Sequence, residues 1–319
     1  MTIIITGANR GLGYATARIL ASDKSQTIVL AGRNLHRLTM AAQHIQALTG
    51  NTHLVPMLLD LADIAAVRKF THEFRSHNFS PLTTIICNAG MSKPTVQERS
   101  ADGFEMMFAV NHLGHFLLAN LLLNCLMPPA RIIFVSGGAQ DPAHARGPML
   151  PPRYVKAEWL AYPERDTSLP TDDPHAGAQA YANSKLCNIL CAYELARRLE
   201  SSGLSIPGQP ITVNVINPGL VAGTGLGSNE KALMRFTWYY MLPVISRLMR
   251  FGRTPAQAGS DLAYLATAPE LAYVTGKYFS GRDMVDSSAE SYDQSKAVEL
   301  WQTSIEMSQL QPEESHLLG

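Results

Sequence analysis

The sequence of 319 residues predicts an α/β fold, with one doubly wound parallel sheet of about seven strands and helices on both faces. Two observations support this: short apolar runs alternate with helical stretches, and the runs are nearly all apolar, as in strands covered on both faces. In chain order the expected strands read TIIIT (2–6), TIVLA (27–31), HLVPMLL (53–59), TTIIC (83–87), RIIFVS (131–136), ITVNVIN (211–217) and KYFSG (277–281).

Between these strands lie the stretches in which we expect helices. They span residues 11–22, 34–49, 62–77, 100–126, 178–201 and 255–268. Strand–helix–strand repeats form right-handed crossovers, which make the strands parallel. Two longer excursions, 138–177 and 222–254, interrupt the alternation, and excursions at the carboxyl edge of a parallel sheet commonly build the ligand site.

The composition excludes some classes of protein. Charged residues make up 16%, hydrophobic residues 46%, and the formal net charge is zero, so the chain should fold and not bind nucleic acid. The four cysteines form no C-x-x-C pair, which argues against a zinc or dithiol site and suits a reducing compartment. Because the first residues already read as a strand and no apolar run looks long enough to span a membrane, we expect a cytoplasmic protein.

A glycine-rich turn follows the first expected strand. Gly7, Gly11 and Gly13 lie in TGANRGLG (6–13), between that strand and the first helix. Glycines let the backbone approach a pyrophosphate, and a helix N-terminus offers unpaired N–H groups to the anion. The spacing differs from the common G-x-G-x-x-G, but its position favours dinucleotide binding.

Two arginines indicate which dinucleotide. An NAD site calls for an acidic residue after the second strand, whereas here Arg33 stands at that point and Arg10 lies within the glycine turn. Guanidinium groups suit the 2′-phosphate of NADP(H), and the alternative is that both are solvated surface residues. Asp60, after the third strand, could accept a hydrogen bond from the adenine amino group.

A tyrosine and a lysine lie one helical turn apart in AYANSK (180–185). Residues i and i+4 share a helix face, so Tyr181 and Lys185 can point into the same space. An ammonium favours the phenolate, so we expect the pKa of Tyr181 to fall from its usual ~10 and the phenol to serve as a proton donor and acceptor. Considered alone, such a pair is also typical of a solvated helix surface.

Six motifs in order resemble the short-chain dehydrogenase/reductase family over nearly the whole chain. They are TGANRGLG, DL (60–61), NAG (88–90), VNHLGHF (110–116), YANSK (181–185) and NPG (217–219). The resemblance implies a single Rossmann domain over residues 1–319 that binds NADP(H) and transfers hydride from or to the nicotinamide. It also argues against the interpretation of Tyr181 and Lys185 as a solvated surface pair.

The resemblance also implies roles for particular residues. Tyr181 is the general acid or base at the substrate oxygen, Lys185 lowers its pKa and bonds the nicotinamide ribose, and Asn111 holds a water that links Lys185 to solvent. The implied cofactor contacts are Gly7, Asn9, Arg10, Gly11, Leu12, Gly13, Arg33, Asp60, Leu61, Asn88, Ala89, Gly90, Tyr181, Lys185, Pro218, Gly219 and Thr224.

The chain departs from the family where a serine normally assists the tyrosine. The corresponding position, six residues after Arg131, is Gly137, and a serine stands one residue earlier at Ser136. One residue along a strand reverses the side chain, so Ser136 serves as a catalytic donor only if the strand has already ended there. The threonine that often contacts the pyrophosphate is also displaced, with Gly223 first and Thr224 next.

A narrower resemblance points to the branch that holds retinol dehydrogenases and light-dependent protochlorophyllide oxidoreductases. It is carried by VNHLGHFLLANLLL, SKLCNIL, RTPAQAGSDLAYLAT and LWQTSIEMSQL, and it implies a bulky apolar substrate whose carbonyl or alcohol carbon reacts. One alternative is reduction of a conjugated C=C in a tetrapyrrole, although Leu220 replaces the usual cysteine of that group. Another is a cofactor-binding protein with little catalysis, which Gly137 suggests.

The second excursion contains an apolar and aromatic stretch, ALMRFTWYYMLPVISRLMRF (232–251). In the family context it reads as a lid over the substrate, and the alternatives are a peripheral membrane contact and plain core packing. Association with a membrane therefore stays open at this point, as does a homodimer. His112 and His115 are expected to pack in the core, not to bind metal.

Overall fold

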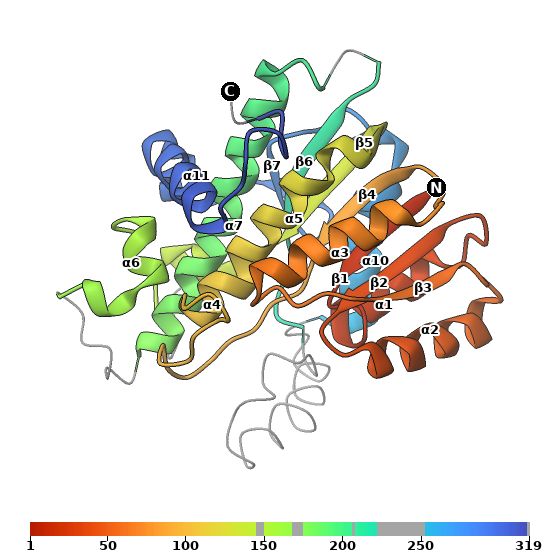
Figure 1. Ribbon diagram of the computed structural model, residues 1–319, viewed down its shortest axis with the longest axis horizontal. Helices are drawn as coiled ribbons and strands as arrows, with labels where there is room; N and C mark the ends of the chain where they lie inside the picture. Colours follow the sequence, from red (N-terminus) through yellow and green to blue (C-terminus); the bar gives the residue numbers. More distant parts are fainter. Residues whose placement is uncertain (145–149, 168–174, 206–207, 222–252, 318–319) are drawn as a thin grey trace.

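A computed structural model describes residues 1–144, 150–167, 175–205, 208–221 and 253–317, and shows one sheet of eight strands in the order β3-β2-β1-β4-β5-β6-β7-β8 (Figure 1). The strands are β1 (Thr2–Thr6), β2 (Thr27–Gly32), β3 (Leu54–Leu58), β4 (Leu82–Cys87), β5 (Leu126–Val135), β6 (Ile211–Asn217), β7 (Lys277–Ser280) and β8 (Asp283–Val285). All seven expected strands are confirmed and parallel. The structure adds an eighth strand, β8, which is antiparallel to β7. This strand is too short and exposed to show a recognisable pattern in the sequence.

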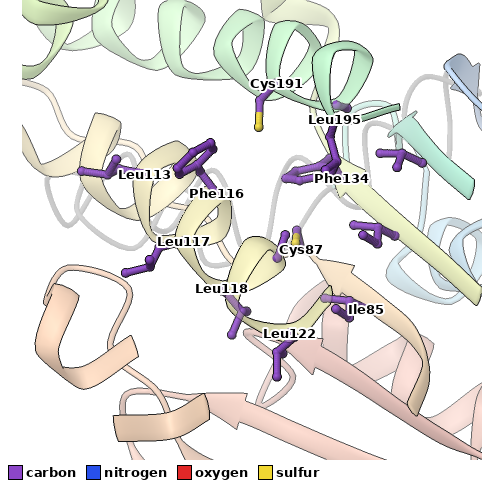
Figure 2. Close-up of a cluster of buried hydrophobic side chains, with 14 of the residues drawn as sticks. Ile85, Cys87, Leu113, Phe116, Leu117, Leu118, Leu122, Phe134, Cys191 and Leu195 are labelled. Atoms are coloured by element: carbon purple, nitrogen blue, oxygen red, sulfur yellow. The ribbon is translucent and has the colours of Figure 1, made fainter. Parts of the chain in front are cut away.

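Helices cover both faces of this sheet, as the sequence predicts. Alternate residues of β1 divide between the faces, with Ile4 in one hydrophobic cluster and Ile3 and Ile5 in the other. The Ile4 side is covered by α3 (Ile64–Ser76), α5 (Gly114–Leu122) and α7 (Ala176–Ser201), and the opposite side by α1 (Gly11–Leu20), α2 (Leu35–Thr49) and α10 (Pro255–Thr267). Figure 2 shows Phe116 of α5, Phe134 of β5 and Cys191 and Leu195 of α7 meeting in the first cluster.

Capping residues explain where several helices begin. The Asn34 side chain accepts from the Arg37 N–H at the start of α2, and the Asp63 side chain does the same for Ala66 at the start of α3. At α10, Thr254 and Gln257 form a reciprocal capping box. These caps place the helix starts within two residues of the expected positions.

The helix expected over 100–126 begins later and changes its winding. It runs as α4 (Met106–Phe108), a π-helical segment (Ala109–Leu113), α5 and a short 3₁₀ turn (Leu123–Cys125). By length and composition alone Met106–Cys125 could span a membrane, which corrects the expectation that no run is long enough. However, 89% of its apolar window is buried within the protein, so it is a core helix.

An outer helix, α11 (Gln294–Ser308), was not among the expected helices, although part of its sequence carries the narrower family resemblance. Its buried side includes Ser304 and Ser308, which interrupt the apolar stripe that would have marked it. Trp301 anchors it, with its ring edge-on to Phe116 at 4.9 Å between centroids, and Ser304 Oγ lies 2.9 Å from His112 Nε2. This helix therefore covers α5 and α7 from outside (Figure 1).

The two long excursions differ in how much of them the structure describes. Part of 138–177 folds over the start of α7 and includes α6 (Ala157–Ala161), tied to α11 by the bond from Ala157 N–H to Glu299. Most of 222–254, including Thr224 and the stretch 232–251, lies outside the described residues. The assignment of that excursion as lid, membrane contact or core therefore stays a prediction.

Candidate active site

The sheet topology brings the sequence motifs to one edge. The chain leaves β1 toward β2 and later returns to place β4 on the other side of β1, so their carboxyl ends form a topological switch point. Ligands of open α/β sheets bind at such points. The glycine turn after β1 therefore lies beside Asn88–Gly90, which follow β4.

Packing explains the glycines of the turn. Gly7 and Gly11 have φ of +68° and +58°, a region that side chains disfavour. A Cβ on Gly13 would lie 2.6 Å from Asn88 Nδ2 and 2.7 Å from Gly7 O, so no larger residue fits. The Arg10 side chain does not cap α1, which leaves the first amides of this helix available to an anion.

Thr6 joins the turn to the rest of the site. Its hydroxyl oxygen accepts from the backbone N–H groups of Asn88 and Ala89 at 2.9 and 2.8 Å. With both lone pairs occupied, the hydroxyl hydrogen is left for His115 Nε2 at 2.9 Å, and the Nδ1–H of that ring then donates to Asn111 O at 3.1 Å. Burial lowers the pKa of His115 to about 4, which keeps it neutral and fits this arrangement.

His115 thus packs in the core, as predicted, but the sequence analysis missed its hydrogen bonds to Thr6 and Asn111. His112 is also buried, and burial lowers its pKa to about 3. The described residues contain no group of three His, Cys, Asp or Glu that could hold a metal ion. The i, i+4 spacing of Asn111 and His115 could have indicated their shared helix face, but no sequence signal marks the contact of His115 with Thr6.

Tyr181 and Lys185 lie on the same face of α7, with Lys185 Nζ 5.5 Å from the centre of the Tyr181 ring. Lys185 is buried, and its Nζ donates to Val135 O at 3.4 Å. The expected lowering of the tyrosine pKa is not seen: burial raises the pKa of Tyr181 to about 12 and lowers that of Lys185 to about 8. Desolvation by burial causes both shifts, because each group is harder to ionise away from water.

Asn111 lies in the π-helical segment beside this pair. Its side-chain amide bonds the backbone of Met91 in both directions, at 2.8 and 2.9 Å, and donates to Ser184 Oγ at 2.9 Å. A Cβ placed on Gly90 would lie 3.4 Å from both Asn111 Oδ1 and Lys185 Nζ. Gly90, Asn111 and Lys185 therefore converge, and π-helical turns of this kind are frequent at functional sites.

The serine at the end of β5 is directed away from this space. Ser136 is 3% exposed, and its hydroxyl donates to the backbone oxygen of Lys185 at 2.8 Å. Its proton is therefore committed to α7, and the described contacts give it no part at a substrate oxygen. Gly137 has ordinary extended backbone, and a Cβ there would meet nothing within 4 Å.

The remaining residues that are predicted to contact the cofactor differ in their exposure to solvent. Arg10 and Arg33 are exposed at the same sheet edge, and within the described ranges neither forms an ion pair. Asp60 accepts from the Ala62 N–H at 3.0 Å and is half-buried. Leu12 and Leu61 are core side chains, so only their backbones can face a nucleotide.

At the end of β6, Gly219 has φ of +75°, and its N–H donates to Asn217 Oδ1 at 2.9 Å. Pro218 is buried just before it and Asn9 is half-buried in the glycine turn, so the structure places both at the sheet edge where the other candidates gather. Thr224 lies outside the described residues.

We predict that Ser136→Ala lowers the free energy of unfolding by about 1 kcal/mol, because the buried bond to Lys185 O is lost. Turnover should fall less than tenfold. Chemical denaturation and steady-state kinetics measure the two effects. A loss of two to three decades in kcat without a change in stability would instead make Ser136 a donor to the substrate oxygen.

A second prediction concerns the buried ammonium. The pKa of Lys185 is depressed in the folded protein, so the protonated form is favoured in the unfolded chain, and the wild type should gain stability as pH rises from about 8 toward 10.5. Lys185→Met has no such charge to bury. The free energy of unfolding of wild type minus that of the variant should therefore rise between pH 7 and 9.5, on the order of 1 kcal/mol for each pH unit above about 8. A flat difference would contradict a buried, charged lysine.

Comparisons with known proteins identify the family. A family model described as short chain dehydrogenase matches residues 1–148, and one described as AcuH dehydrogenase domain matches residues 226–317. Retinol dehydrogenase 13 of Homo sapiens is 35% identical, over 96% of this chain and 84% of its own. Protochlorophyllide reductase A of Oryza sativa subsp. japonica is 32% identical, over 95% of this chain and 79% of its own.

Solved structures show the same fold. A crystal structure of a blue fluorescent protein from a metagenomic library, in complex with NADPH, matches with a TM-score of 0.60 and 22% identity. The match covers 88% of this chain and 97% of that one. The chain is thus an oxidoreductase of the short-chain dehydrogenase/reductase family, in a branch similar to retinol dehydrogenases and protochlorophyllide reductases.

Proposed function

We propose that this protein transfers hydride between NADP(H) and the carbonyl or alcohol carbon of a bulky apolar substrate. The observation that carries the proposal is the convergence of Tyr181, Lys185 and Asn111 near Gly90, at the carboxyl ends of β4 and β5. The relatives in this branch include a retinol dehydrogenase, which supports an apolar substrate. Residues 1–319 would act as one nucleotide-binding domain.

The residues present fit a nicotinamide dinucleotide. The close glycine turn and the uncapped amides of α1 suit the pyrophosphate, while Arg10 and Arg33 suit a 2′-phosphate. Asn9, Leu12, Asp60, Leu61, Asn88, Ala89, Gly90, Pro218, Gly219 and Thr224 complete the proposed contacts. When bound, the nicotinamide supplies or accepts the hydride.

Around that hydride transfer, the chain's own residues handle one proton. Tyr181 donates it to the substrate oxygen during reduction and takes it during oxidation. The Lys185 ammonium stabilises the phenolate that Tyr181 forms when it gives up its proton. Asn111 fixes the backbone near Met91 beside the ammonium. Ser136 positions α7 through the Lys185 carbonyl and leaves the substrate oxygen to Tyr181.

Reduction of a conjugated C=C in a tetrapyrrole is the second candidate, favoured by the similarity to protochlorophyllide reductase A of Oryza sativa. Leu220 is 38% exposed beside Gly219, where that group of enzymes usually carries a cysteine. Turnover that depends on visible light would support this candidate. Turnover of apolar aldehydes in the dark would support hydride transfer to a carbonyl.

We predict that Tyr181→Phe lowers kcat/KM for an apolar aldehyde with NADPH by two to four decades, because the proton donor is lost. The dissociation constant of NADPH should change little. Steady-state kinetics and calorimetry measure the two quantities. Tight NADPH binding without turnover in the wild type, unchanged by Tyr181→Phe, would identify a cofactor-binding protein with little catalysis.

The cofactor preference is tested at Arg33. Since a guanidinium–phosphate bond is charge-assisted, Arg33→Ala should weaken NADPH binding by about tenfold or more and leave NADH binding unchanged. Arg18→Ala, at the far end of α1, is the matched control and should alter neither affinity. An unchanged preference in Arg33→Ala would overturn the assignment of this arginine to the 2′-phosphate.

A further inference from the structure

A second cavity lies on the other side of α7 from Tyr181. It is lined by the first turns of α7, by α4 and by the described part of the first excursion, and its volume is about 90 Å³. Its walls are mostly apolar, with aromatic rings contributed by Phe108 and Trp159. Its apolar walls with a few polar groups are typical of a small-molecule site.

Helix geometry separates this cavity from the catalytic centre. Ala176, Ala180 and Asn183 line it and recur at the spacing of one helix face. Tyr181 and Lys185 are turned roughly 140–180° from Ala176 around the same helix, at 3.6 residues per turn. The helix itself is therefore the wall between the two spaces, and a molecule in the cavity does not touch the Tyr181 face.

One polar group in the cavity wall lacks a partner. Glu105 is 1% exposed, and its Oε2 accepts from the Phe108 N–H at 2.7 Å. Its Oε1 is buried and has no hydrogen-bond partner within the described part of the chain. The Arg99 guanidinium, whose charge acts on Glu105, is already bonded to Glu164 and to Val96 O. A buried acceptor left in this state costs about 1–3 kcal/mol.

The other polar wall groups are already satisfied by the protein. Asn183 Oδ1 accepts from the Arg153 N–H at 2.6 Å, and the Arg153 guanidinium pairs with Asp166 at 2.7 Å. What the cavity lacks is thus a donor opposite Glu105. Burial raises the pKa of Glu105 to about 7, so near neutral pH a bound donor can still meet an ionised carboxylate.

We propose that this cavity is a second ligand site, which binds a flat apolar molecule carrying one O–H or N–H donor directed at Glu105. The aromatic walls hold the apolar body, and the free oxygen of Glu105 selects molecules with a donor over those with an acceptor alone. The site does not use Tyr181, so it is independent of the proposed hydride transfer.

Two matched probes test the proposal on the intact protein with NADPH bound. 2-Naphthol carries a donor, whereas 2-methoxynaphthalene has the same ring system without one, and neither has an alcohol carbon that can lose hydride. Calorimetry should show 2-naphthol binding about tenfold tighter, the effect of one buried hydrogen bond. Equal affinities, or no binding of either probe, would overturn the proposal without any substitution.

Variants then locate the site. Glu105→Gln keeps an oxygen for the Phe108 N–H but presents an NH₂ group in place of the acceptor, so the tenfold difference should vanish. Glu98→Gln, an exposed neighbour, is the matched control and should retain it. Trp159→Ala should weaken both probes, and Tyr181→Phe should leave both affinities unchanged. Persistence of the difference in Glu105→Gln, or its loss in Tyr181→Phe, would refute the assignment.

Discussion

The hydroxyl of Thr6 is the constraint on which the arrangement of the site depends. It lies at the last residue of β1 and fixes two amides that follow β4 and one histidine of α5. Through His115 it reaches the carbonyl of Asn111, which lies beside Lys185. Without this group two partly buried N–H donors and a buried neutral imidazole would each need a new partner. The glycine turn and the catalytic helix pair are therefore held in one hydrogen-bonded unit.

The buried ammonium of Lys185 shows a different balance of forces. Its only described bond, to Val135 O, is long, and desolvation lowers its pKa to about 8. A buried ammonium with one long bond lowers the stability of the fold. Its retention is explained by function and not by packing. The same burial raises the pKa of Tyr181, so both groups are held in their neutral forms more readily than in water. A small nearby charge can therefore change their protonation strongly.

Much of the fold could be predicted because its signals are local. The seven parallel strands are mostly apolar, and helix starts are marked by Asn34, Asp63 and Thr254. The helix α11 was missed because serines occupy its buried stripe, and β8 because three exposed residues carry no pattern. In the site, the shared face of Tyr181 and Lys185 followed from their spacing, whereas their pKa directions depend on burial depth, which spacing does not reveal.

Contacts between residues far apart in the sequence set the remaining limit on what could be predicted. Thr6 and His115 are 109 positions apart, and nothing local to either residue marks the bond between them. The direction of Ser136 was left open because it depends on where β5 ends, and the structure ends that strand at Val135, with the hydroxyl bonded to α7. The unpartnered oxygen of Glu105 likewise exists only because the first excursion folds over α4.

The helix α7 links the two spaces that it separates. Ser184 lines the cavity that contains Glu105, yet its oxygen accepts from Asn111 Nδ2 and its hydroxyl donates to Tyr181 O. Asn111 in turn bonds both backbone groups of Met91, next to Gly90. Because each of these bonds is buried or nearly so, a shift of Ser184 cannot be absorbed by water and must move Asn111 or the backbone of Tyr181. The wall between the two spaces is thus made of the residues that set the catalytic geometry.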